Sequence, residues 1–161
     1  MLNGKAARWA AFAALLAGVI GVWLYPTDEK RVKAAAEAIA SAANAGPSEL
    51  AQALEAYAVP DVRVSVSDLP LAVTGREDLV RLVTEANAAG QKLHLRVEAV
   101  EVLVEGNHAR LNADLVATQA EVPELRVPRH SVALFEKRAG RFRLVSAEIG
   151  AERRDQPEAR P

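Results

Sequence analysis

Cysteine is absent from this chain, and aromatic residues make up only 4% of it. Without thiols the chain can form no disulfide, no thiolate nucleophile and no cysteine metal site, although this composition is compatible with any compartment. Few aromatic rings also mean few flat surfaces on which a ligand could stack. Residues 28–161 hold eighteen basic and twenty-one acidic residues, a net charge of −3. This net negative charge disfavours nucleic acid as a partner. The sequence also has no basic stripe with interleaved aromatic residues and no lysine-rich block to hold anionic lipid.

The longest uniform feature of the sequence is an uncharged run at residues 9–27. As an α-helix these nineteen residues would extend roughly 28 Å, close to the ~30 Å hydrocarbon thickness of a bilayer. Trp9 lies at one end of the run, and Trp23 and Tyr25 lie at the other. Such amphipathic rings favour the headgroup layer. The sequence therefore predicts a transmembrane anchor at residues 9–27 that contacts the lipid bilayer, preceded by a short basic tail.

A cleaved signal peptide is the alternative interpretation of the same run. Leu24, Tyr25 and Pro26, however, are not the small residues that a signal peptidase requires, and this favours the anchor. Basic residues flank the run on both sides, so the positive-inside rule gives nearly a tie. A short basic tail before an apolar run is the usual layout of a signal anchor. We therefore expect the N-terminus inside and the remaining chain on the periplasmic or extracellular side of the membrane.

Residues 28–150 are long enough for one domain with one core, and the polar tail at 151–161 is expected to be disordered. Apolar residues at three- and four-residue steps predict helices at 27–45 and 48–58. A third helix is expected from 74 to 89, opened by a capping box between Thr74 and Glu77. A half-buried strand is expected at 62–66 because valines alternate there with polar residues. The fold class is therefore α+β.

From Lys92 onward the apolar residues alternate with period two, which predicts four antiparallel neighbouring strands. The expected turns are Gly106-Asn107, Val122-Pro123 and Ala139-Gly140.

A conflict in the first of these hairpins predicts a bend. If residues 106–107 form a two-residue turn, Val104 faces Ala109, and further out Leu95 faces Thr118 and His94 faces Gln119. The apolar side chains of both strands then change sides of the pleat near residues 99–100. Because strand alternation has period two, this change requires a bulge or a strong bend. We therefore expect a sheet that curls around the helices.

The order of elements and four short motifs resemble the nuclear transport factor 2-like (SnoaL-like) superfamily over residues 29–150. The motifs are Asn44-Ala45-Gly46, Pro60-Asp61-Val62, Gly75-Arg76-Glu77 and the closing strand that begins at Gly140-Arg141-Phe142. The resemblance implies a cone of three N-terminal helices wrapped by a strongly bent antiparallel sheet.

The superfamily includes enzymes such as ketosteroid isomerase, and the resemblance allows its catalytic positions to be compared. The oxyanion-donating tyrosine falls on Ile39, which has no proton to give; the general-base aspartate falls on Asp68; the second oxyanion donor falls on or near Ser131. A base without its electrophilic partners lacks preorganised stabilisation of the developing charge, which usually contributes most to catalysis. The resemblance thus argues against isomerase-type activity, and Asp68 is more simply a turn residue before Leu69-Pro70.

The three histidines also give no strong site. His94, His108 and His130 lack the spacing that places two metal ligands side by side, so no metal and no cofactor is predicted.

Two functions remain open. The favoured one is a single-pass membrane protein that displays a non-enzymatic domain for protein association or assembly at the cell envelope, as a homodimer or with an envelope partner. The alternative is a small-molecule binder, lyase or isomerase that uses the interior of the cone, with Asp68, His94 and Ser131 as pocket candidates.

Overall fold

The computed structural model describes residues 27–67, 70–90, 93–119 and 122–150. Nearly all of the predicted anchor, Asp68 and the predicted disordered tail lie outside these ranges. Within them, no helix combines the length and the apolarity that crossing a membrane requires.

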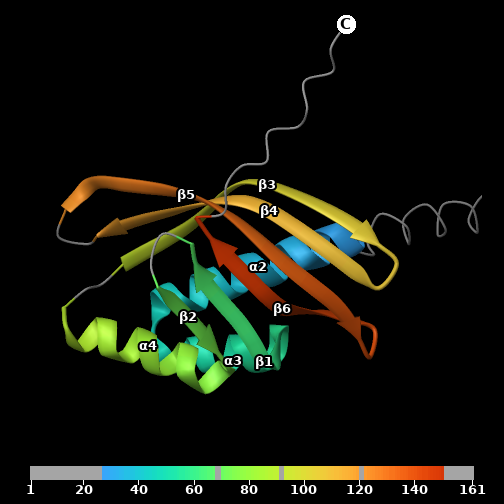
Figure 1. Cartoon of the computed structure of the whole chain (residues 1–161), viewed down its shortest axis with the longest axis horizontal. Helices are drawn as coiled ribbons and strands as arrows, with labels where there is room; N and C mark the ends of the chain where they lie inside the picture. The colour runs from blue at the N-terminus through green and yellow to red at the C-terminus, as the bar shows by residue number, and fades with distance from the viewer. Residues whose placement is uncertain (1–26, 68–69, 91–92, 120–121, 151–161) are drawn as a thin grey trace, which may run out of the picture.

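Three helices cover one face of the sheet: α2 (Asp28–Ala45), α3 (Pro47–Tyr57) and α4 (Arg76–Ala88) (Figure 1). Thr27 caps α2 by accepting a hydrogen bond from the Lys30 amide at 3.4 Å. Gly46 joins α2 to α3 with φ of +149°, a conformation that favours glycine. The predicted capping box at residues 74–77 is wrong. Residue 74 ends strand β2, and Gly75, with φ of +99° and no side chain, occupies the cap position of α4.

Six strands form a single sheet in the order β2-β1-β6-β5-β4-β3. They are β1 (Ala58–Val66), β2 (Leu71–Thr74), β3 (Leu93–Glu105), β4 (His108–Gln119), β5 (Val122–Arg138) and β6 (Arg141–Ile149).

The four predicted antiparallel neighbours are confirmed as β3 to β6. The expectation of a wholly antiparallel sheet is wrong at one place, since β1 pairs with β6 in parallel. The predicted turn at Val122-Pro123 is also wrong, because both residues belong to the start of β5, a position where proline is tolerated. Likewise β1 already begins at Ala58 and continues through Pro60, with a register shift between Ala58 and Arg63.

The predicted bend in the β3–β4 hairpin is confirmed. Val104 opposes Ala109 as expected, but the register shifts by one residue between Glu98 and Glu101, where Ala99 has φ of +50°. Beyond this bulge Leu95 opposes Ala117 instead of Thr118, and His94 opposes Thr118 instead of Gln119. Val97 in one half of β3 and Val100, Val102 and Val104 in the other therefore pack against the core, and the long strands β3 to β5 curve across α2 (Figure 1).

The core lies between the helices and the inner face of the sheet. Its largest fully buried side chains are Val32 of α2, Leu54 of α3, Val59 and Val62 of β1 and Phe135 of β5. Helix α4 is different, because none of its residues is fully buried in the described structure. It packs at the margin of the core, beside the region where the candidate site lies.

Candidate functional site

A cavity of about 290 Å³ lies between the three helices and the inner face of the sheet. Helix α2 contributes Ile39 and three alanines to its wall, at positions 36, 40 and 43. These residues follow helical spacing, so α2 turns a row of short side chains toward the sheet and leaves space that larger residues would fill. Leu82 of α4 also lines the cavity and is 36% exposed, so the cavity reaches the surface beside α4.

Ser131 of β5 is the one polar side chain on the described wall of the cavity. Its Oγ donates a hydrogen bond to the carbonyl oxygen of Ala113 on β4 at 3.1 Å. The hydroxyl proton is therefore engaged, while the oxygen lone pairs can still accept a hydrogen bond. A ligand in the cavity would therefore contact apolar side chains on all described sides, and one hydrogen-bond acceptor, the Oγ atom of Ser131.

The structure brings together two of the three positions that the resemblance to ketosteroid isomerase implied. Ile39 and Ser131 both line the cavity. Asp68 lies outside the described residues, so its relation to the cavity stays a prediction. Neither of the two placed residues is an acid or base that titrates near neutral pH, and the described wall therefore offers no group for acid–base catalysis.

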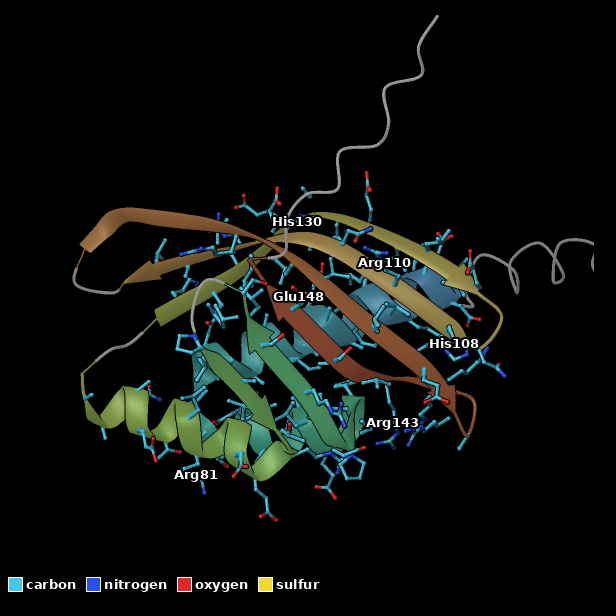
Figure 2. The ribbon with its side chains drawn as sticks, viewed as in Figure 1. Arg81, His108, Arg110, His130, Arg143 and Glu148 are labelled. Carbon is cyan, nitrogen blue, oxygen red and sulfur yellow. The ribbon has the colours of Figure 1, made fainter. Side chains whose placement is uncertain are left out.

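The histidines are placed elsewhere. His94 is exposed on β3 and does not line the cavity. His108 lies next to the β3–β4 turn, and His130 lies on β5 (Figure 2). The Nδ1 atom of His130 lies 3.4 Å from Oδ1 of Asp114 on the neighbouring strand β4. Among the described residues no three potential ligands come close enough to hold a metal ion.

Comparison with protein families identifies the domain. Residues 32–149 match the model of the SnoaL-like domain, which covers most of the chain. The chain belongs to the SnoaL-like family. No curated protein matches it.

Solved structures with the same fold are distant in sequence. A nuclear transport factor 2-like protein of unknown function from Pseudomonas putida has a TM-score of 0.63 at 10% identity, covering 76% of this chain and 85% of that one. A nuclear transport factor 2-like protein from Novosphingobium aromaticivorans gives 0.60 at 19% identity, over 92% and 90% of the two chains. A provisionally assigned dehydratase of the same family from Streptomyces avermitilis gives 0.57 at 19% identity, over 76% and 94%. At these identities the comparisons establish the fold alone.

One contact beside the cavity of this SnoaL-like domain was not predicted from the sequence. It attaches α2 to β3, the strand at the edge of the sheet. The Asn44 side chain donates from Nδ2 to the Leu95 carbonyl and accepts from the Leu95 amide at Oδ1, both at 2.7 Å. Asn44 thus pairs with β3 as a neighbouring strand would. Since Leu95 lines the cavity, this contact fixes part of the cavity wall. The available signal was a polar residue at the end of an otherwise alanine-rich helix.

Proposed function

We propose that this SnoaL-like domain binds an apolar small molecule in its interior without transforming it. The observation that supports this function is the cavity of about 290 Å³, whose described wall is apolar except for Ser131. Its volume is near the lower end of the ~300–1,000 Å³ range of ligand pockets and about twice that of a dry ~150 Å³ cavity that binds benzene. The ligand would be a neutral molecule of about one or two rings, or a short hydrocarbon chain.

The chemistry of the wall sets further limits on the ligand. A charged group would lose its hydration in the cavity without finding a partner on the described wall, at a cost of several kcal/mol. A single hydroxyl or amine could instead donate to Ser131, whose own proton is directed at Ala113. We therefore expect neutral ligands with at most one hydrogen-bond donor to bind in preference to acids.

Binding without catalysis follows from the residues at the catalytic positions that the resemblance implied. Ile39 cannot donate a proton, and the hydroxyl group of Ser131 is a much weaker acid than a carboxyl group. Asp68 remains the weak candidate for a base. If the domain does turn over a ligand with Asp68 as its base, an Asp68→Asn variant will lose that activity, and unchanged turnover would remove Asp68 from consideration.

A fluorescence titration with a neutral apolar probe, N-phenyl-1-naphthylamine, tests the proposed binding. An Ala40→Leu variant places three more carbon atoms in the cavity and should weaken probe binding at least tenfold. Ala51 lies on the exposed side of α3, and Ala51→Leu is the matched control, expected to bind as the unaltered chain does. Equal binding by both variants would place the probe elsewhere and contradict the proposal.

We further propose that residues 9–27 anchor the chain in a membrane and that the domain lies on the periplasmic or extracellular side. Nineteen uncharged residues with aromatic ends support this, and α2 begins directly after them at Asp28. An anchored chain will stay with membranes through alkaline carbonate extraction. A soluble form about 25 residues shorter, seen by immunoblotting of fractionated cells, would instead indicate a cleaved signal peptide.

Self-association is a second candidate function, supported by the outer face of the sheet. Leu103 of β3 is 57% exposed and Leu134 of β5 is 46% exposed, and both lie opposite Arg110 on the strand between them. Exposed apolar side chains that lie near each other on one sheet face can form a surface that a second subunit covers. Light scattering should give a homodimer, and Leu134→Lys should convert it to a monomer. A monomeric unaltered chain would exclude this candidate and favour an envelope protein as the partner.

A further inference from the structure

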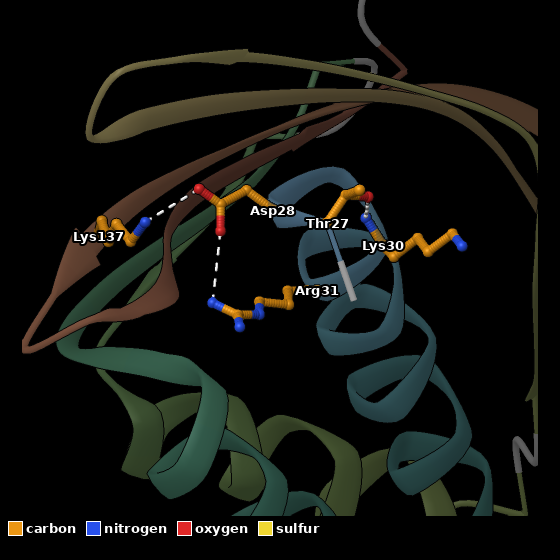
Figure 3. A network of polar contacts seen from close by, with 5 residues as sticks. All are labelled: Thr27, Asp28, Lys30, Arg31 and Lys137. Carbon is orange, nitrogen blue, oxygen red and sulfur yellow. Dashed lines mark hydrogen bonds and ion pairs between the residues drawn. The ribbon is translucent and has the colours of Figure 1, made fainter. Parts of the chain in front are cut away.

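A positively charged surface surrounds the point where α2 begins. We name it the anchor-side surface and define it by residues 28–33 of α2 and the hairpin residues 105–108 and 136–143. These segments are joined by an ion pair of 2.9 Å between Lys137 and Asp28 (Figure 3) and by a hydrogen bond of 2.7 Å from the Lys137 amide to the Asn107 carbonyl. The surface holds seven basic and four acidic residues, a net charge of +3, whereas residues 28–150 together have a net charge of −3. Positive charge is therefore concentrated at one end of an acidic domain.

A cleft of about 490 Å³ opens in this surface. Arg31 of α2 and Arg141 of the β5–β6 hairpin contribute its charged groups, with Tyr57 and Phe142 among its other walls. Arg141 makes no ion pair with any residue that the structure describes. The Nη1 atom of Arg31 lies 3.5 Å from Oδ1 of Asp28. This contact is longer than the 2.9 Å between Nζ of Lys137 and Oδ2 of the same carboxylate. Two guanidinium groups from segments 110 positions apart thus face one cleft with little neutralisation from within the domain.

Phosphate is the chemistry that fits such a cleft. A guanidinium group donates two parallel hydrogen bonds to phosphate oxygens, and two arginines can share one phosphate. The exposed Tyr57 and the alanines of α2 beside it offer an apolar surface next to that anion. A phospholipid headgroup combines a phosphate with adjoining hydrocarbon in the same way.

The location of the cleft identifies where such a headgroup would come from. Arg31 follows Thr27 by four residues, a rise of about 6 Å along a helix. The polar layer on each side of a bilayer is about 5–7 Å thick. If residues 9–27 span the membrane, Arg31 and the cleft lie at the level of the headgroups.

We propose that this cleft binds the phosphate of an anionic phospholipid in the membrane that carries the chain, an inference that rests on the proposed anchor. The linear sequence has no basic block of the kind that usually binds anionic lipid. The fold assembles one from the first turn of α2 and a hairpin near the end of the domain. Binding would hold the domain against the membrane surface in one orientation.

The test uses the full chain in vesicles of phosphatidylcholine, with or without an equal share of phosphatidylglycerol, and a headgroup-linked nitroxide quencher. Because the chain has no cysteine, a fluorophore can be attached at Ala139→Cys on the hairpin, or at Glu85→Cys on α4 as the remote position. The hairpin label should be quenched more strongly with phosphatidylglycerol than without it, and high salt should remove this difference. Arg31→Gln with Arg141→Gln should lower the docked-to-undocked ratio roughly 30-fold, since each arginine contributes about fivefold near an anionic surface.

Arg81→Gln with Arg96→Gln is the matched control, since it removes the same charge from exposed arginines outside the anchor-side surface. Equal quenching in both double variants, or no dependence on phosphatidylglycerol, would overturn the headgroup proposal even if the chain resists carbonate extraction. If carbonate removes the chain, the anchor fails on its own. In that case the headgroup proposal is decided by the quenching measured before the carbonate wash. Quenching that depends on Arg31 and Arg141 would support the proposal, and the absence of quenching would overturn it.

Discussion

The contact between Asn44 and Leu95 should contribute measurably to the stability of the domain. An Asn44→Ala variant removes both hydrogen bonds of 2.7 Å between α2 and β3. Each is half-buried and worth about 1 kcal/mol, so the loss is about 2 kcal/mol. Alanine restores up to about 0.6 kcal/mol through its higher helix propensity. We therefore expect a net loss of about 1.5 kcal/mol in the free energy of unfolding.

Urea denaturation of a chain comprising residues 27–150, followed by circular dichroism, measures this loss. With a slope of about 1.5 kcal/mol per molar, the midpoint should fall by about 1 M at unchanged slope. Asn87→Ala is the matched control: it makes the same change in the last turn of α4, where the side chain forms no hydrogen bond within the described structure. The difference of about 2 kcal/mol between the two variants isolates the pair of hydrogen bonds. If Asn44→Ala is as stable as Asn87→Ala, α2 is not held to β3 in this way.

The bulge and the start of α2 give further predictions. Ala99 has φ of +50°, a backbone conformation that favours glycine and disfavours branched side chains. Ala99→Gly should therefore raise the free energy of unfolding by about 0.5 kcal/mol, whereas Ala99→Val should lower it by about 1 kcal/mol or more. Thermal melts in which Ala99→Val is the more stable variant would show that the backbone at Ala99 is not strained. Lys137→Ala breaks the ion pair with Asp28 and a cation–π contact of 5.3 Å with Phe142, and should cost about 1 kcal/mol in urea denaturation. Arg138→Ala, which breaks a more exposed pair on the same hairpin, should cost less than about 0.5 kcal/mol, and equal losses would argue against the special role of Lys137.

The spacing of apolar residues predicted most of the helices and strands, because it indicates which side chains of each segment point toward the core. The change of apolar face near Ala99 could be found in the sequence, since two strands that each bury one face cannot change it without an extra residue. The capping box failed because Thr74 could serve either a strand or a helix, and only the pairing of β2 with β1 decides between them. The parallel contact of β1 with β6 had no local signal at all.

The cavity could not be predicted for a related reason. The structure places Ala40, Leu95 and Ser131 around the cavity. The spacing of apolar residues indicates which side chains of one helix or strand share a face, but not whether the side chains of different elements meet in the middle. That depends on the curvature of the sheet and on the position of α4. The anchor-side surface could not be predicted either, because its basic residues lie far apart in the sequence and only the fold brings them together.

The parallel pairing of β1 with β6 also determines when the domain can be completed. Ala58 pairs with Leu144, 86 positions later, whereas the neighbouring pairs of β3 with β4 and β5 with β6 are local hairpins. Closing a long loop costs about 0.6 kcal/mol for each doubling of its length and slows folding. During synthesis the helices and β1 emerge first, and β1 cannot complete its pairing until the last strand, β6, has emerged. Until then β1 and β2 form an isolated pair, a period in which aggregation competes with folding.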